Sequence, residues 1–314
     1  MSMGSARPVL LALRALKLGD LLVAVPALRG LRAAFPEHRI VLAAPGWLEE
    51  VLPLVGGVNE LLPTPGLEAP IPWNGPVDVA VNLHGAGPQS HRRLDALSPR
   101  HRIGHEAPGW PGPSWEEGLH ERERWVRLLA WHGLRADAGD FRLGVPVADP
   151  PVHGATLVHV GAAHGSRMWP ADRFAAVAAQ LSRAGHDVRV TGGSGDRERA
   201  ETIAAAAGLP ASCVAAGRWS LSEFASALSA ASLVITADTS AAHFASAYGI
   251  PSVVLFGPAA PEQWGPPGDG PHIVLTDATR RRGDAFAEDP DPALLAVLPG
   301  HVLDAVDRLR LPTS

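Results

Sequence analysis

Short apolar runs and amphipathic stretches alternate along the chain. The first run, Val9–Leu13, contains no polar residue, as in a strand that is buried on both faces. A loop closing at Gly19-Asp20 follows it, and an amphipathic stretch then extends to Phe35. The same pattern predicts further strands at 39–44, 59–62 and 77–83 and a further helix at 47–54. This alternation indicates an α/β unit built on a parallel sheet.

The pattern weakens after residue 83 and later starts again. The segment that follows is rich in His, Arg, Gly and Pro, and helical periodicity returns only at 116–132, so we expect irregular loops between them. Residues 144–151 are extended and rich in proline, as in a linker. We therefore expect an N-terminal domain at 1–150 and a C-terminal domain at 151–314.

A second series of alternating elements occupies the C-terminal half. Strands are predicted at 156–160, 187–191, 233–237 and 252–256, and helices at 171–184, 197–207, 220–230, 240–248 and 301–309. Both halves thus have the pattern of Rossmann-like, doubly wound parallel-sheet domains. Open sheets of this kind bind ligands at the carboxyl ends of their strands, so we expect the two domains to face a central cleft.

Composition narrows the classes of partner. The formal net charge is -5, whereas nucleic-acid binding needs a strongly basic surface, so no nucleic-acid partner is expected. Cys213 is the only cysteine, which excludes an intrachain disulfide and a cysteine zinc cluster and fits a reducing compartment. The N-terminal apolar run is too short to span a bilayer and is interrupted by Arg14 and Lys17. We expect a cytoplasmic, soluble protein with at most peripheral membrane contact.

The most specific polar segment is Asp238-Thr239-Ser240-Ala241-Ala242-His243, which follows an apolar strand and opens a predicted helix. Small residues at 239–242 allow the first amides of the helix to approach a ligand, and the positive end of the helix dipole suits a diphosphate. His243 adds a side-chain donor. The alternative is that Asp238 or Thr239 only caps the helix and that His243 is a core residue.

Five motifs in this order together resemble glycosyltransferase family 9, the bacterial heptosyltransferase-like enzymes. The resemblance spans nearly the whole chain. The matching segments are Gly19-Asp20 with Pro26-Ala27-Leu28-Arg29, then Gly161-Ala162-Ala163, Arg167-Met168-Trp169-Pro170, Asp238 to His243, and Phe256-Gly257-Pro258. Three positions depart from the family pattern: Arg167 stands where Lys is frequent, Ser240 replaces a Gly, and Val160 replaces a Pro.

The resemblance implies a GT-B fold, in which the last helix can pack back toward the N-terminal domain, and an inverting transfer that needs no metal and no cofactor. It makes an ADP-linked sugar the leading donor, with heptose as the leading sugar. The acceptor expected from the resemblance is a glycan, a lipid-linked glycoside or a small-molecule glycoside. It also implies that Asp20 is the catalytic base and that the donor is bound by Gly161, Arg167, Asp238, Thr239, Ser240, Ala241 and His243.

The chemistry of an inverting transfer explains the role expected of Asp20. The acceptor hydroxyl attacks the anomeric carbon opposite the nucleotide, and a carboxylate must accept its proton. Asp20 follows the first strand and can meet that need, the alternative being that it caps the first helix. Positive charge on Arg14, Lys17, Arg29 and Arg32 either attracts a phosphorylated acceptor or forms a solvated helix face.

Other activities remain open at this point. A nucleotide-sugar epimerase or hydrolase of similar fold, or a non-catalytic nucleotide-sugar binding protein, is compatible with the same segments. Asp289-Pro290-Asp291 has the Asp-x-Asp spacing of metal-dependent glycosyltransferases, but it lies among prolines, and we interpret it as a solvated loop. Gly192-Gly193-Ser194-Gly195 is not a dinucleotide fingerprint and reads as a tight strand-to-helix turn or a nucleotide contact.

Overall fold

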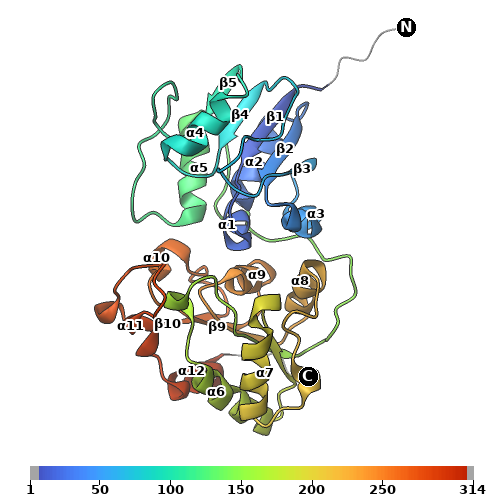
Figure 1. Cartoon of the computed structure of the whole chain (residues 1–314), viewed down its shortest axis with the longest axis vertical. Helices are drawn as coiled ribbons and strands as arrows, with labels where there is room; N and C mark the ends of the chain where they lie inside the picture. The colour runs from blue at the N-terminus through green and yellow to red at the C-terminus, as the bar shows by residue number, and fades with distance from the viewer. Residues whose placement is uncertain (1–6, 310–314) are drawn as a thin grey trace. The chain divides into compact units, whose positions relative to one another are not determined.

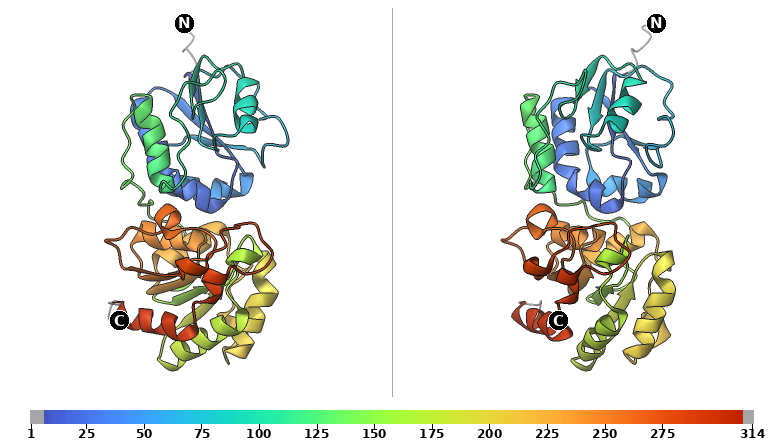
Figure 2. Two further views of the ribbon diagram at one scale, coloured as in Figure 1. Left: turned by 90° about the vertical axis from the view of Figure 1, so that its left-hand side faces the viewer. Right: turned by 60° about the vertical axis from the view of Figure 1, so that its left-hand side comes forward.

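The computed structural model describes residues 7–309, which form two compact units. One unit ends at Gly144 and the other begins at Val145, so the division falls inside the proline-rich segment 144–151. Each unit contains one five-stranded parallel sheet with helices packed on it (Figures 1 and 2). The predicted α/β class with two doubly wound parallel sheets is confirmed.

The N-terminal unit, unit 1, has the strand order β3-β2-β1-β4-β5. Its strands are β1 Val9–Leu13, β2 Arg39–Ala44, β3 Glu60–Pro63, β4 Val79–Asn82 and β5 His101–Ile103. Its helices are α1 Leu18–Val23, α2 Val25–Ala34, α3 Leu52–Val55, α4 Pro88–Asp95 and α5 Glu121–Trp131, with a 3-10 turn at Gly46–Val51. The order of the strands reverses between β1 and β4, which makes this pair the topological switch point of the unit.

The C-terminal unit, unit 2, has the strand order β10-β9-β8-β6-β7, which reverses between β6 and β8. Its strands are β6 Thr156–His159, β7 Val188–Thr191, β8 Leu233–Ala237, β9 Ser252–Leu255 and β10 His272–Leu275. Its helices are α6 Ala171–Arg183, α7 Arg197–Ala206, α8 Leu221–Ser229, α9 Ser240–Tyr248, α10 Pro261–Trp264, α11 Pro292–Leu295 and α12 Pro299–Arg308. Short 3-10 turns occur at Gly165–Arg167, Ser194–Asp196, Ala211–Cys213 and Ala278–Arg280.

Two sequence expectations for unit 1 are wrong. The segment expected to be irregular contains α4 and β5. The sequence pattern does not predict α4 because this helix is polar along most of its length and buries only Ser90, His91 and Leu94. The first helix begins at Leu18, so Asp20 is the third residue of α1 and does not end a preceding loop.

The core of unit 2 is continuous from its central strands to its last helix. Val302, Ala305 and Val306 of α12 belong to the same buried cluster as Trp169. The indole of Trp169 is fully buried, donates from Nε1 to the carbonyl oxygen of Val297 at 2.9 Å, and meets a phenylalanine ring edge to face. The Trp-Pro segment that enters α6 is therefore a structural anchor.

No helix within residues 7–309 is both long and apolar enough to cross a bilayer.

A buried histidine makes the stability of unit 2 depend on pH. His159 ends β6, contacts the Thr191 hydroxyl at 3.1 Å, and burial lowers its pKa from 6.5 to about 4. Since the unfolded chain binds this proton more readily, the stabilisation is complete above pH 6.5 and is lost as the pH falls toward 4. From pH 7 to pH 5 we expect the free energy of unfolding of unit 2 to fall by about 2 kcal/mol from this group.

Urea unfolding of unit 2 at both pH values tests this expectation. His159→Asn should show the shallower pH dependence, whereas a matched change at the exposed His153 should leave it as in the parent protein. Equal pH dependence in His159→Asn and the parent would contradict the assignment.

Candidate functional site

The topology of the two sheets selects the loops where a ligand should bind. Ligands of open α/β sheets bind beyond the carboxyl ends of the strands at the switch point. In unit 2 these are the loop after β6, which holds Gly161 and Arg167, and the turn after β8, which holds Asp238 to Ser240. In unit 1 the loop after β1 leads to Asp20. The predicted site residues thus follow strands at the two switch points.

Arg167 and Asp238 come from different loops and form an ion pair. Nη1 of Arg167 lies 3.4 Å from Oδ2 of Asp238. The carboxylate side chain is only 4% exposed, whereas the guanidinium side chain is 26% exposed. A buried carboxylate therefore orients a cation whose outer part still reaches solvent, and a guanidinium with five N–H groups has further donors to offer an anion.

The start of α9 follows Asp238 of this pair closely in the sequence. Thr239 is the N-cap, and its hydroxyl accepts from the amide of Ala241 at 3.3 Å and contacts the hydroxyl of Thr236 at 2.9 Å. The capping alternative thus applies to Thr239. Ser240 is partly exposed at the first helical position, and His243 is half-buried one turn later, 6.2 Å between ring centroids from Trp264.

Gly161 has a packing reason to be glycine. A Cβ at this position would lie 2.2 Å from Oδ2 of Asp196. The same oxygen accepts from the amide of Gly193 at 2.8 Å and thereby closes the turn after β7. The Gly192–Gly195 segment is thus a tight strand-to-helix turn, and the loop after β6 passes close against it.

This contact gives a prediction for Gly161. We expect Gly161→Ala to lower the stability of unit 2 by about 1–3 kcal/mol, because the new methyl group meets a fixed carboxylate. Thermal unfolding of G161A, of Asp196→Ala and of the double variant measures the coupling. The double variant should lose less than the sum of the single changes; strict additivity would show that the clash is not the cause.

The loop that carries Arg167 is held by residues that the sequence analysis did not identify. Arg199 of α7 donates from Nε to the carbonyl oxygen of Val160 at 3.2 Å and from Nη2 to that of Trp169, so it fixes both ends of the loop. Ser166, fully buried, donates from its hydroxyl and its amide to two carbonyl oxygens of the segment 285–287, at 2.8 and 2.9 Å. Arg167 is therefore presented from a firmly held backbone.

The interpretation of Asp289–Asp291 as a solvated loop is wrong for Asp291. This carboxylate is only 2% exposed and accepts from the amides of Arg282, Gly283 and Ala293 at 2.9–3.2 Å, the last as the N-cap of α11. Its oxygens organise backbone and do not point at a metal site. Within residues 7–309, no three His, Cys, Asp or Glu side chains are grouped so that they could hold a metal ion.

In unit 1, Asp20 lies on the first turn of α1. Its Oδ2 accepts from the amide of Lys17 at 3.2 Å, and its Oδ1 lies 3.5 Å from Nη2 of Arg14. The helix-capping alternative is thus partly correct, since Lys17 is the N-cap and Asp20 caps from the third position. The Asp20 side chain nevertheless remains 27% exposed, which leaves it accessible to a substrate.

His84 follows β4, on the other side of the switch point. Burial, and secondly the charge of Arg14, lower the pKa of His84 from 6.5 to about 4, while the charge of Asp20 acts in the opposite direction. The imidazole is therefore neutral at neutral pH. Sequence analysis did not identify this residue, because a single histidine after a strand carries no distinctive pattern.

Arg29 and Arg32 hold neighbouring segments of unit 1. Arg29 donates to the carbonyl oxygens of Val55 and Arg142 at 3.0 and 2.6 Å. Arg32 donates to that of Gly57 at 3.1 Å and to others nearby. Because backbone oxygens bind both guanidiniums, the alternative of a simple solvated helix face is wrong for these two residues.

Known proteins resemble the chain both in sequence and in fold. The sequence model of glycosyltransferase family 9 (heptosyltransferase) matches residues 145–286. Lipopolysaccharide heptosyltransferase 2 of Escherichia coli K12 is 24% identical over an alignment 340 residues long. The alignment covers 93% of this chain and 96% of that protein.

Two solved structures share the fold at low sequence identity. The family 9 glycosyltransferase of Veillonella parvula has a TM-score of 0.77 at 21% identity and covers 96% of both chains. The E. coli ADP-heptose lipopolysaccharide heptosyltransferase II has a TM-score of 0.75 at 20% identity and covers 95% of this chain and 97% of its own.

These likenesses and the paired parallel sheets define the class: the fold is GT-B, and the protein is a glycosyltransferase. Within that class, the C-terminal half of the chain matches glycosyltransferase family 9, and nearly the whole chain is distantly similar to lipopolysaccharide heptosyltransferases.

Proposed function

We propose that the protein transfers a sugar, with heptose the leading candidate, from an ADP-linked donor to an acceptor hydroxyl, with inversion and without a metal ion. The observation that carries the proposal is the Arg167–Asp238 ion pair at the switch point of unit 2, in which Asp238 directly precedes the N-cap of α9. The choice of ADP-heptose is supported by the likeness to the E. coli ADP-heptose lipopolysaccharide heptosyltransferase II, which is named for that donor.

In this proposal Arg167 and α9 bind the diphosphate. The leaving group gains negative charge as its bond to the anomeric carbon breaks, so donors fixed in place stabilise the transition state more than the bound substrate. Asp238 orients the guanidinium through their ion pair. Ser240, Ala241 and His243 belong to the first turn of α9, which would bind the diphosphate. Arg167 thus supplies the positive charge that a metal ion supplies in other glycosyltransferases.

In unit 1, Asp20 would act as the base. The acceptor oxygen forms a bond to the anomeric carbon, the bond from that carbon to the diphosphate oxygen breaks, and the hydroxyl proton passes to a carboxylate oxygen of Asp20. The partial exposure of this side chain and its position at the switch point support the role. The acceptor we propose is a glycan, a lipid-linked or a small-molecule glycoside, and the proposed compartment is the cytoplasm.

Calorimetric titration with ADP, GDP, UDP and dTDP, in the presence of EDTA, tests the donor side of the proposal. We expect selective binding of ADP. Preference for another of the four would keep the site and change the donor, and failure to bind any of them would contradict the proposal.

A further inference from the structure

We propose that Arg14 is a positioning residue that holds Asp20 in the orientation needed to accept a proton. The inference rests on the proposed role of Asp20 as base. The guanidinium of Arg14 donates from Nε to the backbone oxygen of Asp20 at 2.8 Å, and its Nη2 lies 3.5 Å from the carboxylate oxygen Oδ1 of the same residue. One planar group thus contacts both the backbone and the side chain of Asp20.

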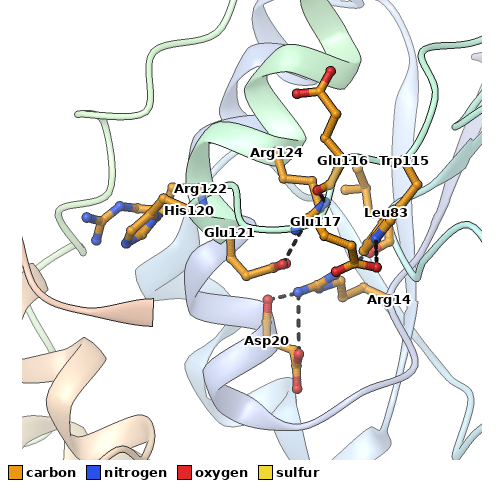
Figure 3. A network of polar contacts seen from close by, with 10 residues as sticks. All are labelled: Arg14, Asp20, Leu83, Trp115, Glu116, Glu117, His120, Glu121, Arg122 and Arg124. Carbon is orange, nitrogen blue, oxygen red and sulfur yellow. Dashed lines mark hydrogen bonds and ion pairs between the residues drawn. The ribbon is translucent and has the colours of Figure 1, made fainter. Parts of the chain in front are cut away.

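The same guanidinium joins the two loops of the switch point. Its Nη1 donates to the backbone oxygen of Leu83, the residue that follows β4 (Figure 3). The amide of Leu83 in turn donates to Leu13 at the end of β1, at 3.1 Å. Arg14 therefore fixes the start of α1, which carries the Asp20 carboxylate, against the end of β4, after which the His84 imidazole follows.

Burial makes this arrangement rigid and costly to break. Arg14 is only 1% exposed, and burial lowers its pKa, while the charges of Asp20 and Glu121 raise it and that of Arg124 lowers it. A buried cation is tolerated only where opposite charge and acceptors surround it. Asp20 is thus one of the two carboxylates that keep this guanidinium charged, and the pairing fixes Asp20 in return.

Helix α5 closes the other side of the guanidinium. The Arg14 Cζ lies 4.6 Å from the centroid of the Trp125 ring, a cation–π distance. Glu121 of the same helix is held by Arg124 at 2.7 Å, and both side chains are buried (Figure 3). The guanidinium therefore has little freedom to move away from Asp20.

This geometry matters for the rate because proton transfer needs the base within about 2.6–3.2 Å of the acceptor hydroxyl. A displacement of about 1 Å can cost about a hundredfold in rate. Lysine at position 14 keeps the charge but cannot contact the Asp20 backbone, the Asp20 carboxylate and Leu83 at once. We therefore expect a graded loss of kcat from the parent protein to Arg14→Lys to Arg14→Ala.

The experiment compares R14K and R14A with Arg29→Ala, a matched control that also removes a guanidinium bound to backbone oxygens of unit 1. Measured are kcat, the donor KM, the ADP dissociation constant and the melting temperature. For R14A we expect kcat to fall about 100-fold with the ADP dissociation constant unchanged within about twofold, and for R14K about 10-fold. R29A should have the kcat of the parent protein at temperatures below the melting temperature of the variant. Millimolar guanidinium should restore part of the kcat of R14A but not that of Asp20→Asn.

Parent-like kcat in R14A overturns the inference, and so does an equal fall of kcat in R14A and R29A, since that would indicate general loss of stability. If R14A does not fold, R14K decides: a parent-like kcat at an unchanged melting temperature contradicts the positioning role. A D20N variant that still turns over would instead refute the proposed base, so the two failures are distinguishable.

Discussion

Asp20→Asn is expected to lower kcat by about 10²–10⁴-fold, the range that a positioned general base contributes. The amide oxygen of asparagine can still accept from the Lys17 amide, so α1 should keep its cap. It cannot take up the acceptor proton. Because nucleotide binding is assigned to unit 2, the ADP dissociation constant should stay within about twofold of the parent value. Steady-state transfer kinetics and ADP titration measure both.

Asp140→Asn serves as the control for this substitution. Asp140 is also an acidic residue of unit 1, half exposed and paired with Arg29. Its replacement should leave kcat near the parent value. Parent-like turnover of D20N, with D140N equally active, would remove Asp20 from the mechanism.

Arg167→Ala is expected to weaken ADP binding by about 10- to 100-fold, because a hydrogen bond to a charged group contributes about 1.5–3 kcal/mol. The loss should be larger for the diphosphate than for adenosine, since the guanidinium is assigned to the phosphates. R167K should recover part of the affinity as a point charge without the paired donors. Calorimetry with ADP and adenosine gives the comparison.

Two further variants make this prediction specific. Arg183→Ala removes an exposed guanidinium of the same unit, from the end of α6, and should bind ADP like the parent protein. R167A also deprives the buried Asp238 of its cation, so R167A/D238N separates lost attraction from new repulsion. Parent-like ADP affinity in R167A would contradict the donor-site assignment.

The elements that the sequence predicts best are those with the plainest apolar pattern. Strands β1, β2 and β8 and helix α9 have the bounds expected from their residues, because an uninterrupted apolar run followed by a polar turn has few alternatives. Helix α4 was missed because its buried face includes Ser90 and His91, and β10 was missed because its residues are all partly exposed.

The site loops could be predicted from sequence, but the charges that support them could not. Arg14, Arg199 and Asp291 have side chains whose ordinary place is the surface, and their partners are backbone atoms that are distant in sequence or supplied by loops. Only the folded chain shows that Arg14 and Asp291 are buried and that all three charges are bound. One local feature of the sequence does indicate burial of Arg14: it directly follows the buried strand β1, so its backbone lies at the edge of the sheet.

The most direct test of the account measures ADP binding and sugar transfer side by side for D20N and R167A, in EDTA. Because the base is assigned to unit 1 and the nucleotide site to unit 2, D20N should bind ADP like the parent protein and transfer almost nothing, while R167A should lose affinity for ADP. Loss of ADP binding in D20N, or parent-like binding in R167A, would contradict this division of roles.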